Sequence, residues 1–122
     1  MPFVAKMIDE KKCMLLDFDG RVTISELEQS RTILKSTLHE SKGYKNILVD
    51  MRKASLVVST IDIQRFVSLH RDELPLGCMI AVVVPSADWD TALFAEDAAY
   101  IHGVLLRVFQ NHHQAYTWLG IS

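Results

Sequence analysis

The stretch Cys78-Met79-Ile80-Ala81-Val82-Val83-Val84-Pro85 is the part of the chain that decides its fold. An unbroken apolar run that ends at a proline is typical of a central strand in a parallel sheet, because such a strand is buried on both faces. Parallel strands need long connections between them, and these are usually helices. We therefore expect strands and helices to alternate on either side of Cys78–Val84.

The segments after this strand fit that alternation. Ser86-Ala87-Asp88 begins a predicted helix that runs to about His102, with Gly103 as its stop. Val104–Phe109 is the predicted last strand, and His112–Leu119 is a short terminal helix.

A second predicted helix lies before Cys78. It begins at Ser59-Thr60-Ile61-Asp62, where a hydroxyl residue can cap the helix and an acidic residue follows in the first turn. We expect His70, on the apolar stripe of this helix, to be a boundary histidine with polar partners. Asn46–Met51 precedes the helix as a predicted short buried strand, and Arg52–Ser55 is a predicted polar link.

The N-terminal third of the chain predicts a hairpin and a helix. Phe3–Lys11 and Cys13–Asp19 are short strands with a tight connection, which favours antiparallel pairing, and Gly20 ends the second strand. Thr23-Ile24-Ser25-Glu26 has the spacing of a capping box. The helix that it opens is expected to run to about Ser41.

The predicted order of elements is β-β-α-β-α-β-α-β-α. Alternating strands and helices of this length imply an α/β fold with right-handed crossovers. The sheet is expected to be mostly parallel, with an antiparallel N-terminal strand at or near an edge. A chain of 122 residues fits a single domain, over residues 1–122.

Composition excludes some classes of partner. Thirteen Lys and Arg residues stand against fifteen Asp and Glu, which gives no electrostatic basis for binding nucleic acid. No apolar run approaches the ~20 residues of a membrane-spanning helix, so we expect no integral membrane segment. The N-terminus lacks the layout of a signal peptide, and Cys13 and Cys78 each open an apolar run as buried thiols would. These features favour the cytoplasm.

No local motif supports an enzyme, a cofactor or a metal site. The chain has neither a glycine-rich phosphate loop nor a nucleophile elbow. Its five histidines are spread over four segments, and the adjacent His112 and His113 would point about 100° apart on a helix. Asp17 and Asp19 share one side of a strand and could do acid–base work, although a solvated strand end is the simpler interpretation. We therefore expect a protein without enzymatic activity.

The candidate site is the edge of the sheet where the parallel strands end. Ligands of such sheets bind beyond the carboxyl ends of the strands, and helix N-termini at that edge favour anions. The candidate rim or anion contacts are Asp50, Arg52, Lys53, Ser86 and Asp88.

Ser59 and Thr60 are candidate regulatory residues on this rim. A hydroxyl at a helix N-terminus is accessible to a kinase, and a phosphate there would interact favourably with the helix dipole and with Arg52 and Lys53 if they lie nearby. The alternative interpretation is that Ser59 only caps the helix.

The third predicted helix is apolar over more than one stripe, which indicates burial on two sides or an interface. It carries four large apolar residues that are candidates for a dimer face or for an apolar pocket: Trp89, Leu93, Phe94 and Tyr100. Tight packing through its alanines is the third interpretation.

The stretch Ile47-Leu48-Val49-Asp50-Met51-Arg52, followed by Ser55 and Ser59-Thr60, is similar to the STAS and SpoIIAA-like superfamily. It resembles the strand, loop and helix start that carry the regulatory serine of anti-sigma factor antagonists, and Ser59 falls at the position of that serine. The switch of those proteins reads Asp-Ser-Ser/Thr-Gly, whereas this chain has Val58-Ser59-Thr60-Ile61. The resemblance implies a SpoIIAA-like fold and a regulatory role.

Further stretches resemble a bacterial branch of small stand-alone STAS and SEC14-like proteins, and they are spread over nearly the whole chain. These stretches are Gly20-Arg21-Val22-Thr23, Ile80–Ser86, Arg107-Val108-Phe109 and Ala115–Leu119. Distant SEC14-like relatives bind lipids, so this resemblance also admits an apolar ligand.

Residues and resemblance together predict a non-enzymatic protein-interaction or regulatory module of the STAS type, similar to an anti-sigma factor antagonist. Its expected partner is another protein or a second copy of the chain. The alternative is a small carrier of an apolar ligand or lipid, as in SEC14-like proteins. An exposed apolar patch would favour the interaction module, and a closed cavity would favour the carrier.

Overall fold

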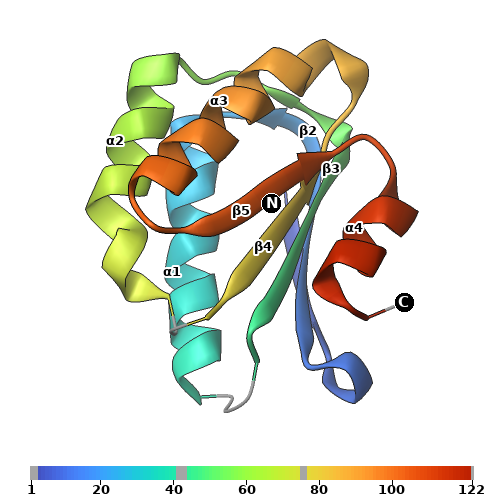
Figure 1. The fold of residues 1–122 in the computed structure, drawn as a ribbon. Coiled ribbons are helices and arrows are strands. Elements are labelled where there is room, and N and C mark those ends of the chain that lie inside the picture. Colours follow the sequence, from blue (N-terminus) through green and yellow to red (C-terminus); the bar gives the residue numbers. More distant parts are fainter. Residues whose placement is uncertain (1–2, 41–43, 75–76, 122) are drawn as a thin grey trace.

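A computed structural model describes residues 3–40, 44–74 and 77–121. They form one five-stranded sheet of order β1-β2-β3-β4-β5 (Figure 1). Strand β1 (Phe3–Ile8) runs antiparallel to β2 (Cys13–Val22), and β3 (Asn46–Leu56), β4 (Met79–Val83) and β5 (Leu105–Phe109) continue the sheet in parallel. The predicted α/β fold, its order of elements and its antiparallel first strand are confirmed.

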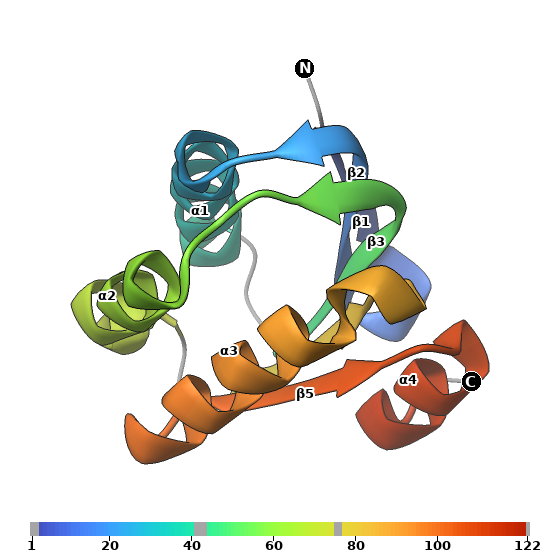
Figure 2. The same cartoon turned by 90° about the horizontal axis from the view of Figure 1, so that it is seen from above.

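Three crossover helices cover one face of the sheet, and the terminal helix covers the other (Figure 2). The crossovers are α1 (Ile24–Glu40), α2 (Thr60–His70) and α3 (Trp89–Ile101), and the terminal helix is α4 (His112–Leu119). All three crossovers share a face because the strands are added in one direction across the sheet, and right-handed connections then keep to one side.

Each face has its own hydrophobic cluster. On the α1–α3 face, buried residues such as Phe18, Ile47 and Val49 pack with Leu34 of α1 and Ala92 of α3. The α4 face has a smaller cluster, which joins five strand residues to the end of the chain: Cys13, Leu48, Ala81, Val83 and Phe109, with Ala115, Leu119 and Ile121. Neighbouring strand residues such as Ile47 and Leu48 therefore enter opposite clusters.

Two strands are longer than predicted. Strand β2 continues past Gly20, which has a φ of +78°, to Val22, and β3 continues through the expected link Arg52–Ser55 to Leu56. These extensions pair with each other, Lys53 opposite Asp19 and Val22 opposite Leu56, beyond the last residue of β4. Because one face of this two-stranded extension is exposed, its sequence is too polar to be read as a buried strand.

The helix ends mostly follow their predicted signals. Thr23 donates its hydroxyl hydrogen to the Glu26 carboxylate at the start of α1, and α4 has the predicted bounds. Ser86–Asp88 form a 3-10 turn, so α3 begins at Trp89 rather than at Ser86. Helix α1 is described as far as Glu40, and the expected end near Ser41 lies outside the described residues.

Both cysteines are buried and free, as predicted. Burial raises the pKa of the Cys78 thiol to about 11, and it also raises the pKa of Cys13. In the described part of the chain, no helix has the length and apolar character needed to cross a membrane.

Candidate functional site

The rim at the carboxyl ends of the strands is built around the connection from β3 to α2. Ser59 has an extended backbone, with φ −84° and ψ 161°, and its Oγ accepts a hydrogen bond from the Asp62 amide at 3.1 Å. The predicted helix cap is therefore confirmed. Ser59 and Thr60 are both exposed. Their regulatory role stays a prediction.

Exposed apolar side chains flank these two hydroxyl residues. Val57 is 41% exposed and Ile61 is 63% exposed. The loop before Ser59 is anchored on one side by the Val57 amide, which donates to the Val22 carbonyl at 2.8 Å. Ser59 therefore lies in a fixed, partly apolar surface segment.

Asp88 anchors the residue that precedes this segment through a hydrogen bond. It is only 9% exposed, and its Oδ2 accepts a hydrogen bond from the Leu56 amide at 3.3 Å. The buried carboxylate joins the turn after β4 to the last residue of β3. Asp88 was expected as a rim contact, and the structure places it in this structural role, whereas the neighbouring Ser86 is exposed.

Asp50 and Arg52 form an ion pair on the α4 face of the sheet. Arg52 donates from Nη2 to Asp50 Oδ2 at 2.7 Å and from Nε to Oδ1 at 3.0 Å, and its Nη1 lies 3.1 Å from Nδ1 of His112. Burial raises the pKa of the Asp50 carboxyl, but the side-chain and backbone hydrogen bonds from Arg52 outweigh it and hold the pKa below its ordinary value.

Lys53 lies on the same face as Arg52, with its Nζ 3.6 Å from Asp17 Oδ2. Two successive residues of a strand share a face here because the register slips. Asp17 is opposite Asp50 whereas Asp19 is opposite Lys53, so β3 has one extra residue at this bulge.

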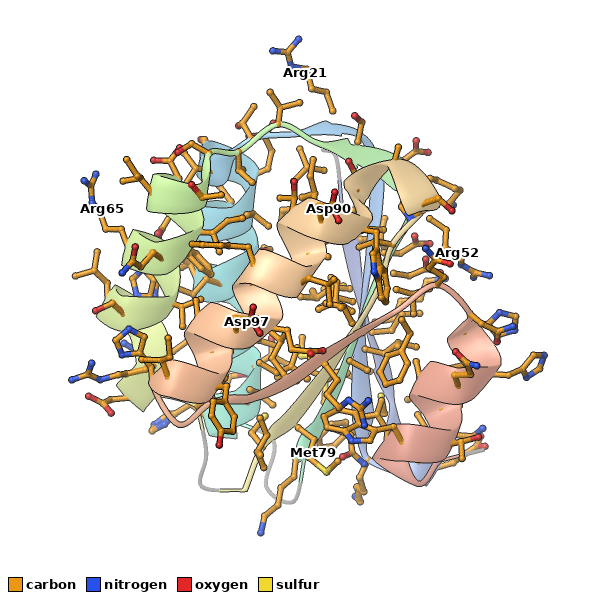
Figure 3. All side chains as sticks on the ribbon, turned by 45° about the horizontal axis from the view of Figure 1, so that its top comes forward. Arg21, Arg52, Arg65, Met79, Asp90 and Asp97 are labelled. Carbon is orange, nitrogen blue, oxygen red and sulfur yellow. The ribbon has the colours of Figure 1, made fainter. Side chains whose placement is uncertain are left out.

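The expectation that Arg52 and Lys53 lie near Ser59 is therefore corrected. Arg52 lies beside the start of α4, away from α2, which carries Arg65 (Figure 3). Arg52 and Lys53 are engaged with Asp50 and Asp17, and the bulge turns both toward the α4 face.

The four candidate apolar residues of α3 do not converge on one pocket. Trp89 and Leu93 are half-buried and line an open hollow with Glu96, beside the end of β5. Phe94 is half-buried, but Tyr100 is 84% exposed. Because Tyr100 points into solvent, the interpretation of this set as a pocket is wrong, and an interface stays a prediction.

Sequence reasoning missed an apolar cavity of about 200 Å³ between the sheet and helices α1, α2 and α3. Side chains from four strands and three helices line it, among them Leu34, Val49, Val67, Val82, Ala95 and Leu106. Each of these residues fits an ordinary core position, so periodicity alone does not reveal a cavity.

Charged side chains gather at one end of this cavity, between α1 and the end of α2. Arg31 Nη1 donates to Glu73 Oε1 at 2.7 Å, and its Nε donates to Glu28 Oε2 at 3.1 Å. His70 has Nε2 2.9 Å from Glu28 Oε1 and Nδ1 3.2 Å from Glu73 Oε2. The prediction that His70 is a boundary histidine with polar partners is confirmed, and its place on an apolar stripe was the one sequence signal for this end.

The described residues contain no group of three His, Cys, Asp or Glu side chains that could share a metal ion. Asp17 is paired with Lys53, and the register between β2 and β3 shifts between Asp17 and Asp19.

Comparison with solved structures shows a SpoIIAA-like fold. A DUF3478 family protein with a SpoIIAA-like fold from Shewanella loihica is 18% identical, with 96% of this chain and 91% of that chain covered at a TM-score of 0.58. The anti-sigma factor antagonist SpoIIAA, in its unphosphorylated form, is 11% identical, with 97% of each chain covered and a TM-score of 0.60. An anti-sigma factor antagonist from Mycobacterium paratuberculosis is 8% identical, with 97% of this chain and 92% of that chain covered and a TM-score of 0.67.

No family model and no curated protein matches the sequence. The structural likeness confirms the predicted SpoIIAA-like architecture, which is a fold that anti-sigma factor antagonists use.

Proposed function

We propose that this protein is a non-enzymatic protein-interaction module of the STAS type, and that its partner surface is the start of α2 around Ser59. One observation carries the proposal: two exposed hydroxyl residues lie between the exposed apolar side chains of Val57 and Ile61. Protein interfaces combine an apolar centre with polar groups that fix orientation, and binding residues are often on loops held by a rigid scaffold.

Ser59 suits a charge-controlled version of this surface. A phosphate there would add about −1.5 to −2 charges at a helix N-terminus, where the dipole favours negative charge. Arg52 and Lys53 are held on the other face, so neither is placed to neutralise it. A modification would therefore leave the helix stable and change what the surface presents to a partner.

A photo-crosslinking residue at position 61 tests this proposal in cells. The wild-type background should give a discrete adduct with another protein, and a crosslinker at the exposed Val4 on β1 should not give the same adduct. Ser59→Asp should remove the adduct, whereas Ser59→Asn should keep it, because both side chains cap helices well and only one is charged. An adduct that is equal in both variants, or no adduct from position 61, would count against the proposal.

A second copy of the chain is the second candidate partner, through a different surface. Tyr100, Ile101 and Leu105 are 84%, 77% and 54% exposed and follow one another from the end of α3 into β5. Analytical ultracentrifugation should then show a dimer that Ile101→Lys dissociates. A monomer in the wild type at high concentration contradicts this candidate.

A further inference from the structure

We propose that the cavity under α1, α2 and α3 binds a medium-chain monocarboxylate, with the chain in the apolar cavity and the carboxylate between α1 and the end of α2. The site does not depend on a protein partner, so it stands or fails separately from the surface around Ser59.

The body of the cavity is suited to a hydrocarbon. Its walls are aliphatic or aromatic side chains from β2 to β5, closed by Leu34 of α1, Val67 of α2 and Ala95 of α3. Apolar walls of this kind favour an apolar molecule over water, since water finds few polar partners beside them.

The volume limits the length of the chain. A cavity of about 200 Å³ is somewhat larger than an engineered cavity of roughly 150 Å³ that holds benzene. Octanoate is therefore a suitable probe, whereas a long-chain fatty acid exceeds the space.

The charged end offers a cation to an anion. The charged or ionisable residues that line the cavity are Arg31, Lys35, His70, Arg71 and Glu73. Glu28 and Glu73 hold Arg31, and Asp72 lies 3.9 Å from Arg71, so the carboxylates match the cations in number and the exposed Lys35 is the cation that an anion can reach. All of them come from α1 or from the end of α2 and the turn after it. A ligand with one anionic end therefore has one orientation in which its charge meets positive charge and its chain meets apolar walls.

Lys35 is the cation most readily available to a carboxylate. Its Nζ lies 3.8 Å from Glu73 Oε2, and its side chain is 57% exposed. Arg31, by contrast, is held at 2.7 Å by Glu73 and at 3.1 Å by Glu28. A bound carboxylate can therefore attract Lys35 without breaking the bridge that joins α1 to the end of α2.

Isothermal titration calorimetry with octanoate and octanol tests the assignment. Octanoate should bind saturably, and octanol should bind at least about fivefold more weakly because it lacks the charge. Lys35→Met should weaken the binding of octanoate by about fivefold, which is the size expected for one partly exposed charge contact, and should leave the binding of octanol unchanged. The matched control Lys6→Met, on the edge strand β1, should leave both unchanged. Equal affinity for octanoate and octanol overturns the proposal.

A cavity-filling exchange locates the ligand. Ala95→Phe should reduce octanoate binding at least tenfold, whereas Ala87→Phe, the same exchange at an exposed position, should not. If Ala95→Phe fails to fold, methyl NMR of the wild type decides the question. Octanoate should shift the methyl signals of Leu34, Val82 and Leu106, and shifts confined to other residues, or no saturable shift, overturn the proposal.

Discussion

The two faces of the sheet are packed in different ways. On the α4 face, an eight-residue helix buries Ala115 and Leu119 directly against strand residues such as Ala81, and both alanines are fully buried. On the other face, three helices line a cavity that is partly open to solvent, and the eleven residues of α2 bury only Ile63. No residue of α4 is among those that line the cavity.

Residue size and helix placement explain this difference. Small side chains at Ala81 and Ala115 let α4 approach β4 closely, as dense protein interiors require. Helix α2 packs beside α3 instead (Figure 1). Arg71 Nη1 lies 3.1 Å from His102 Nδ1 where the two helices end. A helix that rests on its neighbour leaves space above the strands, so the same sheet has one closely packed face and one with room for a ligand.

The largest expected effect comes from truncating neighbouring residues of β3 that point to opposite faces. Leu48→Ala should lower the free energy of unfolding by about 3–5 kcal/mol, within the range for fully packed positions. Ile47→Ala should cost about 1 kcal/mol less, because Ile47 lines the cavity and has fewer contacts to lose there. Urea unfolding at pH 7 measures both, and equal losses would contradict the difference in packing.

Enlarging one alanine on each face should change the stability by a smaller amount, and the two faces should respond differently. Ala115→Leu should destabilise the protein by about 1–3 kcal/mol, since α4 leaves no room for added methylenes. Ala95→Leu should be neutral or slightly stabilising, because the added atoms enter the cavity. Thermal unfolding of the two variants compares them, and a loss at Ala95→Leu as large as that at Ala115→Leu would show that the cavity is not available.

The smallest expected difference between the two faces is in the stability that their ion pairs contribute. On the α1–α3 face, burial raises the pKa of the Glu73 carboxyl, but hydrogen bonds from Arg31 and His70 outweigh it and lower the pKa. Asp50 on the α4 face also has a lowered pKa, through Arg52. Both carboxylates therefore add stability above about pH 4, and this stability is lost as the pH falls through their lowered pKa values.

Removing either arginine checks this pH dependence. At pH 7, Arg31→Met and Arg52→Met should each lower the free energy of unfolding by at most about 1 kcal/mol. Arg31 should matter more, because it joins α1 to a residue 42 positions away, whereas Arg52 pairs two positions along its own strand. Urea unfolding at pH 2 should show little difference from the wild type, and a loss that persists there would assign the effect to packing.

Local signals in the sequence were enough to predict the arrangement of elements. The apolar run before Pro85 marked β4, which lies inside the sheet between β3 and β5, and Ser59 and Thr23 marked helix starts that the structure confirms. The bulge in β3 has no such signal, because it arises from the register between two strands. It turns Arg52 and Lys53 toward the α4 face, where they pair with Asp50 and Asp17 rather than lie beside Ser59.

The cavity could not be predicted for a similar reason. Its lining residues satisfy the same apolar pattern as a filled core, and its volume depends on how far α2 lies from the sheet. Only His70, an ionisable residue within an apolar stripe, marked the place where the cavity meets charged groups. The apolar pattern of a sequence indicates which side chains face inward, but it does not indicate how closely a helix approaches the sheet.

Methyl NMR under xenon pressure tests the difference between the two faces most directly, since xenon enters empty apolar cavities whatever their natural ligand. We predict saturable shifts at Leu34, Val82 and Leu106 on the α1–α3 face and unchanged signals at Leu48, Ala81 and Ala115 on the α4 face. Equal shifts on the two faces, or no shift on either, would contradict this structure of one closely packed face and one that encloses a ligand-sized cavity.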